Sequence, residues 1–442
     1  MHDADAPGPP YRVLSLDGGG TWAVIQVKTL IRLFGAETLG HDVLAKFNLA
    51  VANSGGSVIL ASLAVNHRLL DILSLYIDER KRRSAFRPTP CEWMVRKIGG
   101  GLLPYPRYST KKKRAALSNY LGPNANVLLS RWQGDHPRLA NLVITAFDYD
   151  VKRAAFFRTN TASLAGSQSA SGRLDATLLD AVNASANPPV LYFDKPARVQ
   201  LANEHRWRRY WDGAVAGYNN PAMAAVVEAL ADREAYGAKT SRASIASGVS
   251  DERVGRRPIH ILSIGTGTVH RPRRPVGIGL CDPRFIGGEP ECLVRDVQAL
   301  SDAIVDDPPD AATFVAHVTL GGSLPRSGEV VTEGPIVRMN PVVRPVLDGL
   351  EWKWLPGLGD KEWARLTTLG LDALAQDDIE LVMRLCDAWL SGGVRNQPIR
   401  PRDDNLDAEI GHDNFVDALR AFPLPPAATT RVENSPADTS PR

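Results

Sequence analysis

The clearest pattern along the chain is a set of short apolar runs that end in glycine-containing turns. The run RVLSL at 12–16 precedes the loop DGGG at 17–20, and the run FNLAVA at 47–52 precedes NSGG at 53–56. Apolar runs of this length, bounded by glycine, predict buried strands. Apolar residues at helical spacing follow both loops. The N-terminal part of the chain therefore predicts two strand–turn–helix units.

The same alternation continues toward the C-terminus. Apolar strands are predicted at 139–148, 154–158 and 259–264, and helices at 174–185, 222–233, 292–305 and 361–389. Strands that alternate with helices predict an α/β fold with a largely parallel sheet covered by helices.

Composition and charge place the chain among ordinary globular proteins. Of its 442 residues, 44% are hydrophobic and 23% charged, and the net charge of +3 (52 minus 49) is too small to indicate a nucleic acid polymer as partner. Four cysteines without CxxC spacing favour neither a zinc site nor a disulfide framework. No apolar run approaches the roughly 18–20 residues of a membrane span, and the N-terminus lacks the features of a secretory signal. These features predict a reduced, cytoplasmic protein.

One segment departs from this balance. Residues 80–114 contain twelve Lys or Arg side chains and a single acidic one, Glu92, with aromatic and aliphatic residues interleaved. Such a segment is typical of a peripheral membrane surface, which would place the protein at the inner face of the membrane. A solvated cationic loop with a few core anchors fits the pattern equally well, and both interpretations stay open.

Changes in composition predict the domain organisation. The expected parts are a disordered leader at 1–10, a catalytic domain at 11–345 with a mobile insertion at 238–257, a C-terminal helical part at 346–393 packed on the core, and a polar, largely disordered tail at 394–442.

Three glycine-flanked strand ends carry the candidate chemistry: Asp17 to Gly20, Asn53 to Gly56, and Asp212-Gly213. In a parallel sheet such ends lie on one rim, where the active sites of open α/β folds form. Ser54, between a strand and a helix N-terminus, has the position of a nucleophile. Gly18, Gly19 and Gly20 offer unobstructed backbone N–H groups for an oxyanion.

Asp212 offers a carboxylate that could take the serine proton without an intervening histidine. Because the free pKa of aspartate is about 3.9, we expect burial near Trp211 and Tyr210 to raise it.

In this order the motifs resemble those of the patatin-like phospholipases, a family with a Ser–Asp dyad. Further matches are Ala184-Ser185-Ala186 with Pro188 and Phe193, the strand SIGTG at 263–267, and RMNP at 338–341, so the resemblance covers about residues 11–390. It implies a three-layer α/β/α fold with a mainly parallel central sheet.

The resemblance also implies the roles of individual residues. Ser54 would be the nucleophile, Asp212 the general base, and Gly18, Gly19 and Gly20 the oxyanion hole, with Asp17, Gly56 and Gly213 in support. The implied substrate is a membrane phospholipid or another lipid ester, with no cofactor and no metal. Some bacterial members are switched on by a nucleotide signal, but no feature of this sequence indicates a nucleotide site. The oligomeric state is left open.

Two positions depart from the family pattern. The usual GxSxG elbow has Ala52 at its first position, and Trp22-Ala23 stands where a basic residue and glycine usually follow DGGGx. Elbow geometry and substrate preference are the properties that these changes would affect.

Three alternative functions each explain part of the sequence. A Ser-His-Asp α/β-hydrolase would need His260, His270 or His317 as its base, but the serine comes too early in the chain for that fold. A sugar-kinase-like ATPase would use DGGGT as a phosphate loop and would need a β-hairpin after Thr21. A non-catalytic lipid-binding protein with the same fold would explain the changes at Ala52 and Trp22.

Overall fold

The computed structural model describes residues 9–89, 106–159, 175–202, 207–232, 257–269, 310–343, 346–348, 351–353, 358–401 and 408–422. The expected leader at 1–10, apart from its last two residues, and the insertion at 238–257, apart from residue 257, lie outside this set. So does the helix expected at 292–305.

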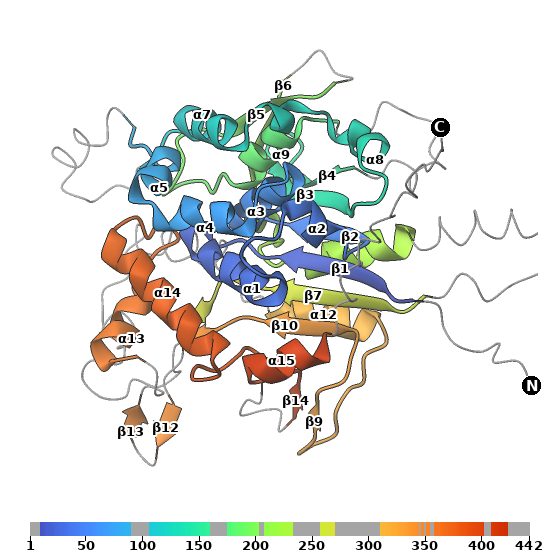
Figure 1. Cartoon of the computed structure of the whole chain (residues 1–442), viewed down its shortest axis with the longest axis vertical. Coiled ribbons are helices and arrows are strands. Elements are labelled where there is room, and N and C mark those ends of the chain that lie inside the picture. The colour runs from blue at the N-terminus through green and yellow to red at the C-terminus, as the bar shows by residue number, and fades with distance from the viewer. Residues whose placement is uncertain are drawn as a thin grey trace, which may run out of the picture.

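A central sheet runs through the molecule in the strand order β10-β7-β1-β2-β3-β6-β5, with β4 paired to β3 (Figure 1). Its strands are β1 (Tyr11–Leu16), β2 (Leu49–Ala52), β3 (Asn141–Asp148), β4 (Arg153–Arg158), β5 (Ala197–Gln200), β6 (Trp207–Asp212), β7 (Ile259–Ile264) and β10 (Ile336–Met339).

Most of this sheet is parallel, as predicted. Strands β10, β7, β1, β2 and β3 all run in the same direction, with Val13 opposite both Leu49 and Ile261. Strands β4, β5 and β6 are added through antiparallel pairs. The short strands outside the sheet are β8 (Thr268–Val269), β9 (Val330–Val331), β11 (Val342–Val343), β12 (Val346–Asp348), β13 (Glu351–Lys353) and β14 (Glu409–Ile410).

Helices cover both faces of the sheet. Larger helices are α1 (Val24–Phe34), α3 (Ser54–Ala64), α4 (Leu69–Ile77), α5 (Glu79–Ala85), α7 (Thr110–Leu121), α9 (Leu178–Ser185), α12 (Asp310–Thr319), α13 (Asp360–Leu366), α14 (Gln376–Leu390) and α15 (Phe415–Ala421). Short ones are α2 (Gly40–Leu44), α8 (Trp132–Asp135), η1 (Gly20–Ala23), η2 (Pro123–Asn126), η3 (Leu129–Arg131) and η5 (Gly213–Ala216). Residues 222–232 are also helical.

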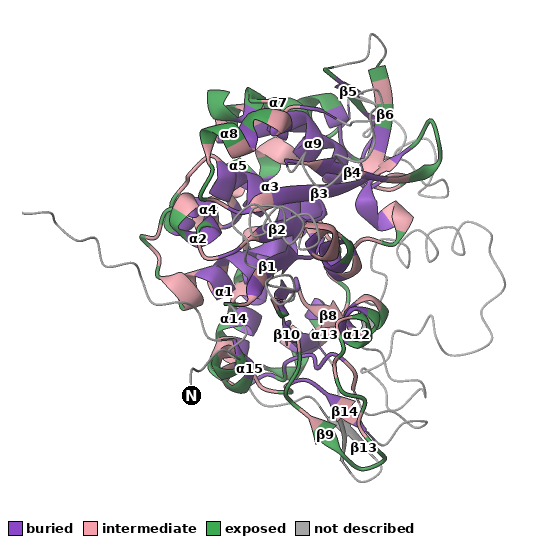
Figure 2. Ribbon diagram, turned by 90° about the vertical axis from the view of Figure 1, so that its right-hand side faces the viewer, coloured by how far each residue is buried: buried purple, intermediate pink, exposed green. Residues whose placement is uncertain are grey.

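The alternation of side chains along the strands explains the two helical layers. In β1, Leu14 and Leu16 join the core beneath α1, α3 and α14, whereas Val13 joins the opposite core beneath α12 and the helix at 222–232. Successive side chains of a strand point to opposite faces, so a strand that is apolar at every position must be covered on both. Figure 2 shows the resulting buried interior along β1, β2 and β3. The predicted three-layer α/β/α fold is therefore confirmed.

The expectation of a largely disordered tail at 394–442 is wrong for part of that segment. Residues 394–401 and 408–422 are folded, and α15 buries Phe415 against Trp389 of α14 with a ring-centroid distance of 4.6 Å. Although the segment is mainly polar, a few apolar side chains such as Phe415 pack on the core and hold these residues in place. Residues 402–407 and 423–442 lie outside the described set.

Among the described residues, no helix has the length and hydropathy required to cross a membrane.

Candidate active site

Ser54 lies at a sharp turn between β2 and α3. Asn53 is extended (φ −124°, ψ 150°), and Ser54 follows with φ 47°, a left-handed conformation that is rare for a residue with a side chain. Backbone strain of this kind concentrates at functional sites, and a serine in such a strand–helix turn has the geometry of a nucleophile elbow. The Ser54 N–H donates to Ser185 Oγ at 2.9 Å, and the side chain is nearly buried.

Glycines allow the turn to lie directly against the DGGG loop. A Cβ atom on Gly56 would lie 2.6 Å from the carbonyl oxygens of Leu16 and Asp17, and one on Gly55 would lie 2.8 Å from the carbonyl oxygen of Gly20. Real Cβ atoms do not approach backbone so closely. The glycine turn after Ser54 and the glycine loop after β1 are therefore interlocked.

The amides of the DGGG loop are not equivalent. The Gly18 N–H donates to the Asn219 carbonyl at 2.8 Å, and the Thr21 N–H donates to the Leu371 carbonyl at 2.8 Å. The N–H groups of Gly19 and Gly20 make no hydrogen bond to any residue that the structure describes. Gly20 has φ 56°, and a Cβ on Gly18 would lie 3.0 Å from Ser54 Cβ, so the loop passes directly beside the serine.

Asp212 reaches this point from the opposite direction. It ends β6, which runs antiparallel to β3 with Asp212 opposite Ala146. The expectation of three parallel strand ends is therefore wrong for this residue. The last residue of β2, Ala52, is opposite Ile144 of β3, and Asp212 is opposite Ala146, two residues further along β3. The end of β6 therefore lies near Asn53, which follows β2. The predicted residues are brought together, but by strands of mixed direction.

The carboxylate of Asp212 is fully buried and held by hydrogen bonds. Its Oδ1 accepts from Asn53 Nδ2 and from the Ala214 N–H, both at 2.9 Å. The Asn53 amide is itself oriented, since its Oδ1 accepts from Thr145 Oγ1 at 2.8 Å. Gly213 is required beside this pair, because a Cβ there would lie 2.3 Å from Asn53 Oδ1.

Burial raises the pKa of Asp212 above its ordinary value. Hydrogen bonding with the Ser54 side chain, the Ala214 N–H and the Asn53 amide lowers this pKa, as does the positive charge of Lys113, but the effect of burial is larger. The expectation from sequence named Tyr210 and Trp211 as the source of the burial; Tyr210 is fully buried and Trp211 partly so. A carboxylate with a raised pKa is a better base than a free one.

Lys113 of α7 is a buried cation near this carboxylate. Its Nζ donates to the Asn183 carbonyl and to Asn187 Oδ1, each at 2.9 Å, and to the Ala186 carbonyl, and it lies 4.4 Å from the centroid of the Phe193 ring. Burial lowers the pKa of Lys113 well below its ordinary value, whereas Asp212 and Asp194 raise it.

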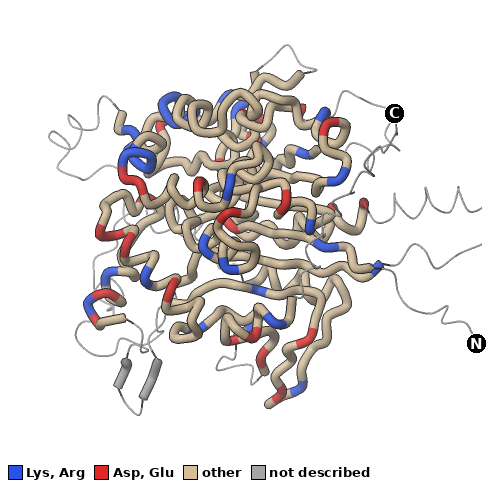
Figure 3. Tube along the Cα trace, in the orientation of Figure 1, with Lys and Arg blue, Asp and Glu red and all other residues tan. Residues whose placement is uncertain are grey.

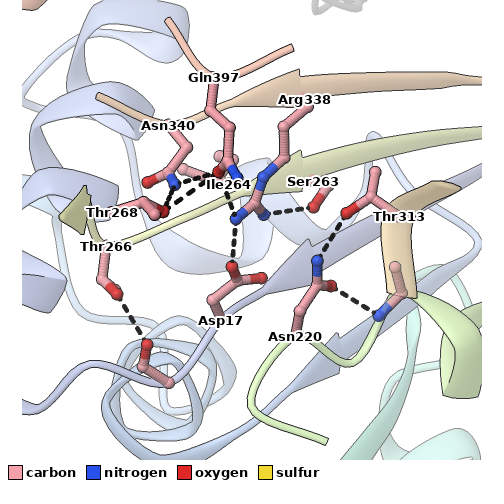
Figure 4. A network of polar contacts seen from close by, with 12 residues as sticks. Asp17, Asn220, Ser263, Ile264, Thr266, Thr268, Thr313, Arg338, Asn340 and Gln397 are labelled. Atoms are coloured by element: carbon pink, nitrogen blue, oxygen red, sulfur yellow. Dashed lines mark hydrogen bonds and ion pairs between the residues drawn. The ribbon is translucent and has the colours of Figure 1, made fainter. Parts of the chain in front are cut away.

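The loop after β1 is fixed by a buried ion pair (Figure 4). Arg338 of β10 donates to Asp17 Oδ2 at 2.6 Å and to Ser263 Oγ at 2.8 Å, and both charged side chains are almost fully buried. Thr266 Oγ1 donates to the Gly18 carbonyl at 2.7 Å. Asp17 therefore sets the start of the glycine loop, while its own pKa is raised by burial and lowered by Arg338.

The two positions that depart from the family pattern are both buried. Ala52 lies in the sheet core between β1 and β3. Trp22 packs into the same core, and its Nε1 donates to the Gly370 carbonyl at 3.1 Å. Trp22 thus links the glycine loop to a distant part of the chain, in place of the charge that is usual at this position.

A mainly apolar cavity opens beside Ser54. Its empty volume is about 840 Å³, including space open to solvent. Ser54, Gly20, Lys113 and Leu371 contribute to its wall, as do Arg82 of α5 and residues of α3, α4 and α7. The lining contains no carboxylate from the described residues. Gly20 and Ser54 thus face a space suited to an apolar chain.

The proposed rival bases lie elsewhere. His260 is in β7 and His317 is in α12, where its Nε2 donates to the Ser323 carbonyl at 3.0 Å, and neither lines the cavity. His270 is outside the described residues. A helix, α1, follows Thr21, whereas a sugar-kinase-like phosphate loop would be followed by a hairpin.

Sequence reasoning missed Asn53, Thr145 and Lys113. Asn53 has the signal of a helix N-cap, which is its commonest role, and Lys113 is one of three consecutive lysines with no sign that only one is buried. Their contacts with the site depend on tertiary structure.

One family model matches the part of the chain that forms this site. Residues 14–226 match the family model described as patatin-like phospholipase. A search of curated proteins finds no match to the chain. Among solved structures, VipD from Legionella pneumophila is 12% identical, with a TM-score of 0.31, and the match covers 86% of this chain and 68% of VipD. The type III effector protein ExoU is 15% identical, with a TM-score of 0.23, and covers 41% of this chain and 40% of ExoU.

The matched residues include the end of β1, the glycine loop that follows it, the Ser54 turn and Asp212. The part of the chain formed by residues 14–226 belongs to the patatin-like phospholipase family.

Proposed function

We propose that the protein is a lipid acyl hydrolase in which Ser54 is the nucleophile and Asp212 the general base. The observation that carries the proposal is the joint geometry of the two residues. Ser54 has a left-handed backbone conformation at the start of α3, and the preceding residue, Asn53, donates to Asp212, a fully buried carboxylate whose pKa burial raises. A serine activated by an adjacent general base is an arrangement that supports acyl transfer.

The reaction proceeds in two steps. Asp212 takes the proton of the Ser54 hydroxyl while Ser54 Oγ attacks the ester carbonyl carbon. The tetrahedral intermediate collapses, the C–O bond to the leaving alcohol breaks, and that alcohol receives the proton from Asp212. Water, deprotonated by Asp212, then attacks the acyl-enzyme and releases the fatty acid and the free Ser54 hydroxyl. Asp212 Oδ2 serves as the base in this scheme, because Oδ1 already accepts from Asn53 and Ala214.

Gly19 and Gly20 are the proposed oxyanion donors. Their N–H groups have no partner among the described residues, whereas the Gly18 N–H is occupied by the Asn219 carbonyl. Gly18 instead gives the loop room to pass beside Ser54. Donors aimed in advance at the developing charge are the usual material of an oxyanion hole.

The cavity supports a lipid ester as substrate, and its charges favour one with an anionic head group. Lys81 and Arg82 line the same cavity as Ser54. Both are cationic side chains, and a phosphate group is a suitable acceptor for ammonium and guanidinium N–H groups.

The surface around the cavity supports peripheral contact with a membrane. Helices α5 and α7 both line the cavity, and Figure 3 shows Lys and Arg gathered on these two helices. Arg80, Lys111 and Lys112 are exposed there. Residues 90–105 of the expected basic segment lie outside the described set.

Hydrolysis of phospholipid vesicles tests the dyad. We expect fatty acid release by the wild type, none by Ser54→Ala, and a loss of about 10²- to 10⁴-fold in kcat for Asp212→Asn, which keeps the shape of the side chain but removes the base. Ser57→Ala is the matched control, because Ser57 lies one turn away with its hydroxyl already donating to the Ser54 carbonyl. A folded Asp212→Asn protein with wild-type turnover would refute the assignment of the base.

A further inference from the structure

One wall of the cavity comes from a segment far beyond the family match. Residues 370–374, here called the cover segment, lie between α13 and α14, and Leu371 lines the cavity together with Ser54 and Gly20. Leu371 also packs against the aromatic cluster of Tyr108, Tyr192 and Phe193. Leu371 therefore lies in the cavity into which an acyl chain attached to Ser54 would extend.

The cover segment is bonded directly to the proposed oxyanion loop. The Leu371 carbonyl accepts from the Thr21 N–H at 2.8 Å and from Thr21 Oγ1 at 2.9 Å, and the Gly370 carbonyl accepts from Trp22 Nε1. A Cβ on Gly20 would lie only 2.3 Å from the Leu371 carbonyl oxygen. Leu371 is thus held at a fixed position relative to Gly20 and, through it, to Ser54.

Further contacts hold the other side of the segment. Asp372 Oδ2 accepts from Arg107 Nη1 at 2.8 Å and from Tyr108 Oη at 2.5 Å, and the Leu374 carbonyl accepts from Arg82 Nη2 at 3.2 Å. These partners come from α5 and from the residues before α7. The cover segment is therefore held by the glycine loop on one side and by α5 and the residues before α7 on the other.

We propose that Leu371 is a specificity-determining residue: its side chain limits the size of the acyl chain that can bind beside Ser54. This inference rests on the proposed function and adds which acyl groups the site accepts. Trp22 stands at the position where the family pattern has a cation. Together with Thr21 it holds the backbone of Gly370 and Leu371, and so fixes the position of the Leu371 side chain. The Leu371 carbonyl is held by Thr21, and the Leu371 side chain packs against the aromatic cluster. Because this packing is close, a longer or branched acyl chain cannot easily displace the leucine.

Acyl-chain selectivity tests the proposal, with Leu371→Ala and Leu371→Trp measured on p-nitrophenyl esters from butyrate to palmitate. We expect the ratio of kcat/KM for long over short chains to rise about tenfold in Leu371→Ala, because a few carbon atoms in a pocket give discrimination of this order. The ratio should fall in Leu371→Trp. Leu374→Ala is the matched control, since Leu374 packs on the same aromatic cluster but does not line the cavity, and its ratio should stay unchanged.

Two outcomes separate this inference from the proposed function. If Ser54-dependent turnover is present but both Leu371 variants keep the wild-type ratio, the inference is wrong and the function stands. If wild type and Ser54→Ala turn over esters equally, the proposed function is wrong. The affinity of the cavity for laurate and for palmitate is then measured by displacement of a bound fluorescent fatty acid. In that assay a palmitate-to-laurate affinity ratio that does not differ between wild type and the two variants overturns the inference.

Discussion

At the scale of residues, the candidate site depends on polar side chains that orient one another below the surface. Asn53 donates to Asp212 and accepts from Thr145, and Ser185 accepts from the Ser54 N–H. Each bond fixes a group that would otherwise be free to rotate. Bonds to a charged group in a buried setting are worth about 1.5–3 kcal/mol each, so the orientation of Asp212 is strongly determined.

Lys113 provides a test of the electrostatics. Its positive charge favours the ionised form of Asp212 and lowers the pKa of that carboxyl. In Lys113→Met the pKa of Asp212 should rise. Because the proposed base must be ionised, the acid limb of the profile of kcat against pH, along which activity increases with pH, should move to higher pH.

Lys112→Met is the matched control for this experiment, because Lys112 is the exposed neighbour on the same helix. Its acid limb should coincide with that of the wild type. The electrostatic account of Lys113 fails if the Lys113→Met protein is folded and active and its acid limb does not move.

At the scale of elements, the site combines parallel and antiparallel strands. The runs at 12–16 and 47–52 predicted β1 and β2 with their turns, because apolar runs before glycines are a local signal. The direction of β6 was not predictable in this way. It follows from the pairing of β6 with β5 and β3, which involves residues far apart in the sequence.

Helices α5 and α7 provide a test of membrane contact. The triple variant Arg80→Ala, Lys111→Ala, Lys112→Ala should bind vesicles containing anionic lipid about 100-fold more weakly, since each cation near such a surface contributes about 1 kcal/mol. Binding of the wild type should weaken as salt is added, because screening acts on exposed charges.

The control is a triple variant with the same loss of charge elsewhere: Arg153→Ala in β4, Arg326→Ala before β9 and Lys361→Ala in α13. It should bind like the wild type. Equal binding by the two triple variants, or binding that is insensitive to salt, would rule out a basic docking face on α5 and α7.

At the scale of the whole molecule, residues beyond the family match complete the site. Arg338 of β10 holds Asp17, and Gln397 and Asn340 extend the same buried network (Figure 4). The resemblance at RMNP identified this stretch as part of the family pattern but gave no role to Arg338. Its role depends on β10 lying next to β7, which only the folded sheet shows.

The Arg338–Asp17 pair should contribute strongly to stability. Arg338→Met leaves a buried carboxylate unpaired, which typically costs about 3–5 kcal/mol in the free energy of unfolding. Urea denaturation measures this change. Without Arg338 the pKa of Asp17 rises further, so the difference from the wild type should shrink as the pH falls and Asp17 becomes protonated.

The exposed pair of Arg395 and Asp413, 3.4 Å apart, supplies the comparison. Arg395→Met should change the unfolding free energy by no more than about 1 kcal/mol. A similar small effect for Arg338→Met at neutral pH would contradict a structural role for the buried pair.

The sequence was most informative where chemistry and backbone geometry coincide in a short stretch, as at DGGG and NSGG. It was least informative where apolar anchors are sparse or partners are distant: α15 within a polar tail, Lys113 within a run of lysines, and Leu371 more than three hundred residues from Ser54. These positions acquire their meaning only from long-range packing.

The most direct test of the central claim is to treat the protein with a fluorophosphonate probe and map the adduct by mass spectrometry of the digested chain. The account predicts one adduct on Ser54, formed in the wild type and in Ser57→Ala, absent in Ser54→Ala and formed much more slowly in Asp212→Asn. No adduct in the wild type, or an adduct on another residue that persists in Ser54→Ala, would contradict it.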